Sequence, residues 1–337
     1  MIESDDRIGG LAKSHEYGGH VFDTGPKRFH TDDPIVITFL EEIARNTMVK
    51  IPRSTEVHFA NRYFDWPLRL ADVRRMPLSI AIPAMMDLLK KKTLEDPISF
   101  HQYIRSRYGE TLYNVFFAPY TKKFLRWDVE DIHSDWASTG INRTVVDSRI
   151  KSNTSLDLIK GLLLPSKIET EFLYPGAGGF GGFYEQLYAL CQDSDRFEVA
   201  LGERVDQLHQ VNDKIEGVTV KGTAFTCGNL VWSGNLNDLS RMIGSDIKLP
   251  YLNTIFYNVV CRDKDVLHQG SQWIYVSDGK TLVSRLTCMK EFASYTCPAG
   301  YYNFVCEVTD SQAKPVYFEQ PEKLVNAIRK ELFDMNL

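Results

Sequence analysis

The 337-residue sequence lacks several features that would define its class. Its six cysteines lie apart, with no C-x-x-C pair and no Cys/His spacing that suits zinc, so neither a metal site nor a disulfide framework is indicated. It has no run of about eighteen apolar residues and no secretory apolar region near its start. We therefore expect a soluble cytoplasmic protein with reduced thiols and no stable membrane insertion.

A strong charge of one sign is also absent. The net charge is -5 and charged residues make up 25% of the chain, so nothing indicates binding to nucleic acid or to an acidic membrane surface. Internal repeats and low-complexity segments are missing too. The length suffices for a large core and suggests two domains, or one with a substantial insertion, and it leaves the oligomeric state open.

A glycine-rich stretch occupies residues 7–30. Two glycine pairs and a Gly25-Pro26 turn allow its backbone to approach a bulky, flat ligand closely. Residues 1–3 are typical of a short strand that ends in an acid, Glu3, and an acid at this place in dinucleotide-binding folds accepts hydrogen bonds from a ribose. Arg7 and the glycine loop that follows it suit a pyrophosphate.

The order of these residues carries a family resemblance. The pattern E-x3-R-x-GG followed by G-x2-FD-x-GP resembles the FAD-binding segment of the flavoprotein group that includes amine oxidases, protoporphyrinogen oxidases, carotenoid desaturases and UDP-galactopyranose mutases. The resemblance implies that Glu3 holds the adenosine ribose of FAD. It assigns the middle of the cofactor to Arg7, Gly9 and Gly10, and the flavin end to Gly25 and Pro26.

Three later segments extend the resemblance. They are similar to blocks that occur in the same order in protoporphyrinogen-oxidase-like and mutase-like proteins. The segments are residues 61–68, residues 108–123 and the W-x6-R spacing of Trp136 and Arg143. The resemblance therefore covers most of the chain rather than its start alone.

Two further segments are similar to cofactor contacts. The turn within residues 174–181 resembles the P-x2-GG-x-G turn that approaches the flavin in mutases, which implies a place beside the cofactor for Gly179 and Gly181. Val205 lies where a family valine bonds the adenine through its backbone. Since a backbone contact accepts many side chains, the assignment of Val205 is less specific than the others.

Two arginines are candidate catalytic residues by the same resemblance. Arg285 lines up with an arginine that faces flavin and substrate in mutases, and Arg143 is the candidate for a second clamp. A guanidinium suits a nucleotide-sugar pyrophosphate because its planar fork binds phosphate oxygens in a bidentate way. The alternative for each arginine is a surface ion pair.

The sequence also departs from the family pattern. Family members begin with a strand and a G-x-G-x-x-G turn, whereas only two residues precede Glu3 here, and the chain stops before a second glycine segment that contacts FAD. We expect a fragment, truncated at both ends. The histidine that mutases carry after Gly-Pro is Lys27, their lysine-glutamine-tryptophan is residues 123–125 with Trp127 displaced, and residues 231–235 replace the usual S-T-x-P strand end.

The expected fold is α/β: an FAD/NAD(P)-binding Rossmann-like domain, incomplete at the N-terminus, with an inserted helical domain and an antiparallel substrate-domain sheet. We assign residues 1–67 and 172–250 to the FAD-binding domain, 68–171 to the helical lid and 251–337 to the substrate-domain strands and closing helix. Helices are expected at residues 34–46, 76–92, 98–107, 110–117 and 321–333. Strands are expected at residues 19–25, 197–201, 204–211, 214–220, 223–227, 229–233, 254–261, 272–277, 281–287 and 301–308, with a hairpin at 56–67 turning at Asn61-Arg62 and a strand, glycine turn and helix at 172–190.

The resemblance implies an FAD-dependent oxidoreductase of the protoporphyrinogen oxidase and amine oxidase-like group. In such an enzyme a hydride passes from a small-molecule substrate to the flavin, and the protein positions and tunes the cofactor. The first alternative is a UDP-galactopyranose mutase-like isomerase that acts on a nucleotide sugar without net redox change. The second is a non-catalytic remnant. Redox chemistry is preferred because the mutase histidine and tryptophan are altered, and no metal site is expected.

Overall fold

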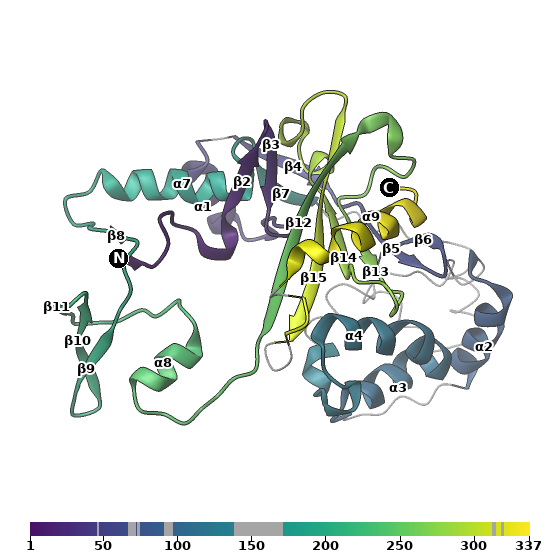
Figure 1. The fold of residues 1–337 in the computed structure, drawn as a ribbon, viewed down its shortest axis with the longest axis horizontal. Helices are drawn as coiled ribbons and strands as arrows, with labels where there is room; N and C mark the ends of the chain where they lie inside the picture. The colour runs from purple at the N-terminus through teal and green to yellow at the C-terminus, as the bar shows by residue number, and fades with distance from the viewer. Residues whose placement is uncertain are drawn as a thin grey trace.

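The computed structural model describes residues 1–45, 47–66, 72, 75–90, 97–137, 171–311, 315–317 and 320–337. It confirms the predicted α/β class: a central sheet separates a group of helices from a part built of smaller sheets and helices (Figure 1). Arg143 and the predicted Pro67 and Pro165 boundaries of the lid lie outside the described residues.

A six-stranded sheet forms the centre, in the order β12-β15-β14-β13-β5-β6. Its strands are β5 Thr55–Phe59, β6 Arg62–Asp65, β12 Leu252–Arg262, β13 Trp273–Val276, β14 Arg285–Cys288 and β15 Tyr301–Ser311. All neighbours are antiparallel except β13 and β5, which are parallel. The β5–β6 hairpin, placed in the first domain by sequence, thus joins the sheet of residues 252–311.

The turn of this hairpin is one residue earlier than predicted. Ala60 and Asn61 both have positive φ, 51° and 56°. Two such residues between antiparallel strands form the type I′ turn whose twist matches a hairpin. The sequence signal for this turn is weak, because its two central residues are Ala60 and Asn61 rather than the Asn-Gly pair that is typical of a type I′ turn.

The two faces of the sheet are buried by different parts of the chain. One face packs on the closing helix, η9 Pro321–Leu324 followed by α9 Val325–Asp334, through a core that includes Ile274, Leu286 and Ile328. The opposite face is shared by two cores. Val57 packs with the helices that follow β6, whereas Trp273 packs with β3 and β7.

The helical part runs from residue 78 to residue 137. Its elements are α2 Leu78–Leu89, α3 Phe100–Leu112, the π-helical η3 Tyr113–Phe117, α4 Ala118–Leu125 and the 3-10 turn η4 Val129–Asp131. The predicted separation of the helices at 98–107 and 110–117 is confirmed, because the run is kinked at Gly109, whose φ of +86° and ψ of 168° are not helical. Glycine is required there because a Cβ would collide with Cβ of Asp87 on α2. Asp87 then accepts a hydrogen bond from the Thr111 N–H at 2.7 Å, which starts the next turn.

The remaining elements lie on the other side of the sheet (Figure 1). The strands are β1 Ile2–Glu3, β2 Ser14–Tyr17, β3 His20–Asp23, β4 Met48–Pro52, β7 Glu171–Pro175, β8 Ala200–Leu201, β9 Gln207–Val211, β10 Lys214–Val220 and β11 Thr223–Thr226. The helices are α1 Pro34–Ile43, α7 Gly179–Gln192 and α8 Leu236–Met242, with 3-10 turns η1 Gly10–Ala12, η6 Asp263–Asp265, η7 Met289–Glu291 and η8 Ser294–Thr296. Strands β1 and β8 are parallel, and the β2–β3, β4–β7 and β9–β10–β11 pairings are antiparallel.

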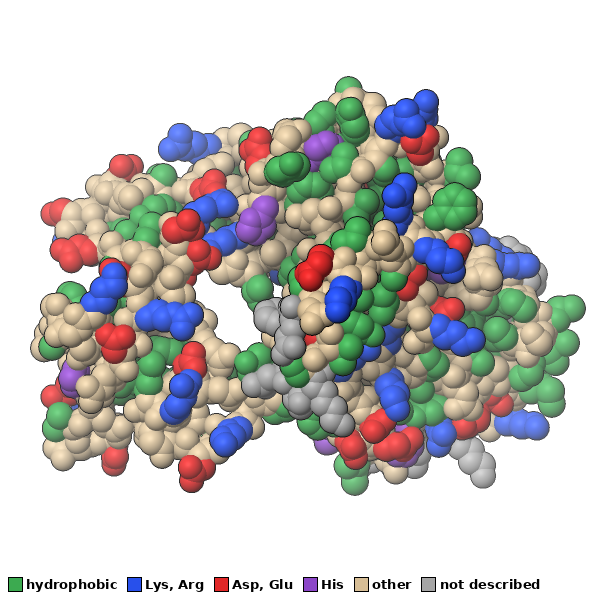
Figure 2. Space-filling view, in the orientation of Figure 1, with side chains coloured by type: hydrophobic (Ala, Val, Ile, Leu, Met, Phe, Trp, Pro, Cys, Tyr) green, Lys and Arg blue, Asp and Glu red, His purple; other side chains and the backbone are tan. Residues whose placement is uncertain are grey.

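Most predicted elements in this part are confirmed, including the strand, glycine turn and helix at 171–192. The strand predicted at residues 229–233 is wrong, because this segment pairs with no strand of the described chain and Val231 is 92% exposed. Between β9–β11 with α8 and the central sheet, the space-filling view shows an opening through the molecule (Figure 2). Among the helices that the structure describes, none combines the length and the apolar character that a bilayer crossing needs.

Candidate active site

A row of polar side chains crosses the middle of the sheet. The strand register places Tyr275 of β13 opposite Arg285 of β14, and Arg285 opposite Glu307 of β15. Directly opposed residues share a face and lie within about 5.5 Å at Cβ. Tyr275 packs against both cores on this face, so the row lies where the helical part meets the α/β part.

The helical part supplies aromatic neighbours to this row. The ring of Tyr120, on α4, meets the ring of Tyr275 edge to face, with centroids 6.0 Å apart. Burial raises the pKa of Tyr120, so its hydroxyl stays protonated. Neither hydroxyl has a hydrogen-bond partner within the described residues, which leaves both available to a ligand.

Arg285 and Glu307 form a bidentate ion pair. Arg285 Nε and Nη2 each lie 2.7 Å from an oxygen of the Glu307 carboxylate, whose residue is 2% exposed. Burial alone would lower the pKa of Arg285, but the adjacent Glu307 carboxylate raises it above its usual range, so the guanidinium stays charged. The guanidinium fork that we assigned to a phosphate is therefore already occupied by Glu307.

The predicted flavin-end turn lies directly against this pair. Gly25 has φ +86°, and a Cβ there would come 2.9 Å from Oε1 of Glu307 and 3.4 Å from Nη2 of Arg285. Pro26, which follows, is buried. Only glycine allows both this backbone conformation and this contact, so the fold brings the N-terminal turn and the sheet residue of the prediction together across 260 residues of sequence.

The N-terminus of α7 is closed by the protein's own side chains. Asp23 Oδ1 accepts a hydrogen bond from the Phe180 N–H at 3.1 Å, and its Oδ2 accepts one from the Tyr174 hydroxyl at 2.7 Å. The Ser14 hydroxyl donates to Asp23 and accepts from the Gly181 N–H at 2.7 Å. Burial raises the pKa of Asp23, although these hydrogen bonds act in the opposite direction.

This arrangement explains both glycines of the turn. A Cβ at Gly179 would come 2.7 Å from Oδ1 of Asp23, and one at Gly181 would come 2.4 Å from the Ser14 nitrogen. The helix N-terminus whose glycines we placed beside the cofactor thus receives the carboxylate of Asp23. Gly179 and Gly181 lie beside the β2–β3 hairpin, and a direct contact between them and the cofactor stays a prediction.

The residues predicted for the adenosine end lie around the pairing of β1 with β8. Glu3 ends β1, its Oε1 accepts from the Asp5 N–H at 2.9 Å, and its carbonyl accepts from the Glu203 N–H at 2.9 Å. Val205 follows two residues later and packs in a small core with Leu208. The structure thus bonds Glu3 to the segment that leads from β8 to Val205.

The loop that follows β1 is bonded to α7 and also has an ion pair within the loop. Arg7 donates to Glu185 of α7 at 2.7 Å, so its guanidinium is partly committed to the protein. Gly9 has φ +108° and its Cβ position would lie 3.3 Å from Cγ of Lys13, which forms an ion pair with Asp5. Gly10 also has a positive φ, 51°, but nothing lies within 4 Å of its Cβ position.

These residues fit a dinucleotide cofactor. Glu3 keeps its second carboxylate oxygen without a partner among the described residues, as an acceptor for ribose hydroxyls requires. The backbone at Gly10 is open on its Cβ side, and the glycine turn at Gly25 allows the closest possible approach to the polar row. FAD would therefore be held by Glu3 and the Gly9–Gly10 loop, with its ring near Gly25.

Sequence reasoning missed the partners of these residues. Asp23 belongs to the G-x2-FD-x-GP motif, but the sequence analysis gave it no role. The signal that could have identified it is an acidic residue in a short strand whose positions are all buried. Glu307 gives a similar signal, because it is the one charged residue in the buried run at 302–308 of the sequence. Tyr275 and Ser14 gave no signal beyond their place in strands.

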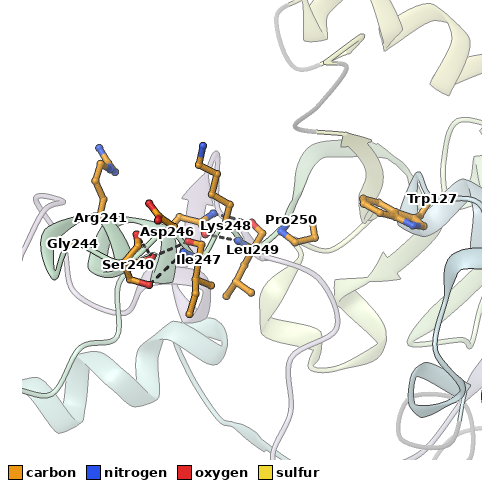
Figure 3. A pocket seen from close by; sticks show the side chains of 11 residues that line it. Trp127, Ser240, Arg241, Gly244, Asp246, Ile247, Lys248, Leu249 and Pro250 are labelled. Atoms are coloured by element: carbon orange, nitrogen blue, oxygen red, sulfur yellow. Dashed lines mark hydrogen bonds between the residues drawn. The ribbon is translucent and has the colours of Figure 1, made fainter.

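A separate cavity of about 780 Å³ lies beside α8. It is lined by residues 244–250 with Ser240 and Arg241, and Trp127 stands apart on its far side (Figure 3). The Ser240 hydroxyl bonds the carbonyls of Ser245 and Ile247, so the polar groups of this wall are used locally. None of the predicted site residues lines this cavity, and no group of three potential metal ligands occurs in the described ranges.

Comparison with known proteins gives a family match and several similar folds. Residues 1–255 match the family model "Flavin containing amine oxidoreductase". A reduced UDP-galactopyranose mutase is similar in structure, with a TM-score of 0.82, 17% identity and coverage of 100% of this chain and 73% of the mutase. A putative protoporphyrinogen oxidase from Exiguobacterium sp. 255-15 has a TM-score of 0.74 and 13% identity, with coverage of 99% of this chain and 76% of the oxidase. A putrescine oxidase has a TM-score of 0.56 and 14% identity, with coverage of 99% of this chain and 74% of the oxidase.

No curated protein sequence matches this chain. The identities to solved structures are low, so these neighbours establish the fold, while the family model covers about three quarters of the chain. The predicted FAD cofactor and oxidoreductase class are confirmed by that match. The chain belongs to the family of flavin-containing amine oxidoreductases.

Proposed function

We propose that this flavoenzyme oxidises a small-molecule substrate at the row formed by Tyr275, Arg285 and Glu307. The observation that carries the proposal is the contact between the Gly25 turn and the Arg285–Glu307 pair. It joins the segment assigned to the flavin to the polar residues of the sheet. Bound FAD supplies the hydride acceptor at this junction.

In this proposal the other residues keep the roles that the family resemblance implies, except where the contacts of Gly179 and Gly181 suggest another. Glu3 holds the adenosine ribose, and the backbone of Val205 contacts the adenine. Arg7, Gly9, Gly10 and Pro26 line the course of the cofactor between them and the ring. Gly179 and Gly181 act by letting α7 approach the β2–β3 hairpin, and Arg143 is kept as a candidate second clamp.

At the row itself, the protein positions charge and excludes water. The Arg285–Glu307 pair fixes two charges beside the reacting atoms without a net charge of its own. The hydroxyls of Tyr120 and Tyr275 orient the substrate by hydrogen bonds. The division into residues 1–67 with 172–250, 68–171 and 251–337 and a cytoplasmic location are part of the proposal, and the six free cysteines support the location.

The experiment is anaerobic reduction of the FAD-loaded protein. Amines, porphyrinogens, sugar nucleotides and organic acids are added in turn while the flavin absorbance near 450 nm is followed. Bleaching by one class identifies the substrate class. A protein that holds FAD through desalting but is bleached by no member contradicts the oxidase proposal, and a protein that retains no FAD is the non-catalytic remnant.

A nucleotide-sugar mutase is the second candidate. The observation that favours it is the positive charge of Lys27, Arg28 and Arg285 at the Gly25 turn, which suits a diphosphate. The occupied fork of Arg285 speaks against it. Incubation of the dithionite-reduced protein with UDP-galactopyranose separates the two functions, because only a mutase yields the furanose form.

A further inference from the structure

Two arginines share one aromatic ring at the edge of the proposed site. Arg28 lies between Phe172 and Trp273, with its Cζ 4.4 Å from the centroid of the Trp273 ring. Cζ of Arg53 lies 5.9 Å from the same centroid. A cation over an indole is stabilised by the ring, but two cations on one ring repel each other. The stacking therefore accounts for one arginine and leaves the second to be explained.

Neither guanidinium is neutralised by a residue that the structure describes. Arg28 donates through Nη1 to the Pro26 carbonyl at 2.8 Å, and Arg53 donates through Nε to the Thr55 hydroxyl at 3.3 Å. Within the described chain neither forms an ion pair, and Arg28 Nε and Arg53 Nη2 are buried without an acceptor. Native proteins rarely leave buried donors unpaired, so these atoms indicate a missing partner.

The charges around them are cationic. Burial is the main reason that the pKa values of Arg28 and Arg53 are lowered, and the group that opposes it for both is the Tyr275 phenol rather than a carboxylate. The cations that act on Arg28 are Arg53 and Arg285, and Lys27 is close enough to both Arg28 and Arg285 to be affected. The two nearby acids are committed: Glu307 to Arg285, and Asp23 to the start of α7.

The geometry points to a site at Arg28 and Arg53 that receives an anionic group of the substrate, a carboxylate or a phosphate. The assignment of the anion to the substrate rests on the proposed function, whereas the anion site itself does not. Trp273 and Tyr275 are two residues apart on one face of β13, so the anion lies roughly 7 Å along the strand from the polar row. The substrate is then an acid or phosphate ester with an oxidisable C–H bond at that distance. A cationic amine would be repelled.

The test is binding of two anion probes to the full chain, loaded with FAD or free of it. Inorganic pyrophosphate and succinate are titrated by calorimetry into the wild type, Arg28→Gln, Arg53→Gln and the double variant. Arg329→Gln is the matched control, since Arg329 is exposed on α9. Saturable binding that is at least tenfold weaker in each single variant and unchanged in the control is expected. The stronger probe shows whether phosphate or carboxylate is preferred.

Three outcomes would overturn the site or its assignment. Equal binding by wild type and double variant removes the site. Loss of FAD retention in Arg28→Gln and Arg53→Gln, with anion binding unchanged, shows that the charges serve the cofactor. Retained anion binding on the FAD-loaded protein without flavin bleaching by any acid or phosphate ester removes the substrate assignment.

Folding and the proposed function are checked separately. If a glutamine variant does not fold by circular dichroism, Arg28→Lys and Arg53→Lys keep the charge and lose the fork, and weaker pyrophosphate binding is expected from them. A wild type that binds pyrophosphate through Arg28 and Arg53 but retains no FAD supports the site while the oxidoreductase proposal fails.

Discussion

Lys123 joins the helical part to the central sheet, and replacing it with methionine should produce a pH-dependent loss of stability. Its Nζ, on α4, lies 2.6 Å from the Val276 carbonyl, 2.8 Å from both the Asp278 carbonyl and the Thr281 hydroxyl, and 2.9 Å from the Val283 carbonyl. Methionine fills a similar volume but donates to none of these oxygens. Leaving a buried acceptor unpaired costs about 1–3 kcal/mol. At pH 10 the amine of Lys123 is neutral and donates two hydrogen bonds, so we expect a total of about 4 kcal/mol at this pH.

The pH dependence follows from the lysine itself. Burial lowers the pKa of Lys123 from its ordinary 10.5 to about 7. Between these values the unfolded chain holds a proton that the folded protein has released, so the stability of the wild type rises with pH through this window and is constant below it. One pH unit corresponds to about 1.4 kcal/mol, which gives about 4 kcal/mol between pH 6 and pH 10. The variant lacks this contribution.

The assay is urea unfolding of wild type and K123M at pH 6, 8 and 10. The difference between the two cancels the titration of all other groups. It should be largest at pH 10 and smaller by about 4 kcal/mol at pH 6. Lys122→Met is the control, because Lys122 is exposed in an ion pair with Asp128 and should change stability by under about 1 kcal/mol. A difference that stays constant with pH, or grows toward acid, refutes the reasoning.

Three further substitutions test the candidate site. Gly25→Ala places a methyl group 2.9 Å from Glu307 at a positive φ, so a loss of about 2 kcal/mol in urea unfolding is expected, with weaker flavin retention; unchanged values would contradict the close contact. Glu307→Gln leaves Arg285 without its buried counter-charge and should cost about 3 kcal/mol, and a neutral effect would show that the pair is dispensable. Glu3→Gln removes a charged acceptor for the ribose, so the dissociation constant of FAD should rise about tenfold, roughly 1.4 kcal/mol, in a fluorescence titration, whereas equal affinity would free Glu3 of its role.

Local sequence signals predicted the elements that depend on local geometry. The glycine turn before α7 and the apolar spacing of its helix were sufficient to place both. The strand predicted at residues 229–233 failed because β propensity needs a neighbouring strand, which this segment lacks in the described structure. The break predicted between residues 107 and 110 is confirmed by the kink at Gly109, but its cause, the approach of α2, is a contact between helices that no local pattern reveals.

For the candidate site, sequence motifs supplied candidate residues but not the partners that the structure shows for them. Glu3, Gly25 and Arg285 were identified from motifs, and the structure connects the last two. The pairing of Arg285 with Glu307 depends on the register of β14 against β15, and a shift of one residue would send these side chains to opposite faces. The hydrogen bond from the Phe180 N–H of α7 to Asp23 likewise requires two segments more than 150 residues apart to meet.

The hydrogen bonds of Asp23 and Ser14 have a consequence for how a ligand enters. They fasten the β2–β3 hairpin to α7, and the residues that follow Asp23 leave from a fixed point. Gly25 is therefore held in place before any guest arrives, so association has little backbone disorder to remove there. The affinity for a ligand at the Gly25 turn therefore depends on the chemistry of that ligand, because little free energy is spent on ordering the backbone of the turn.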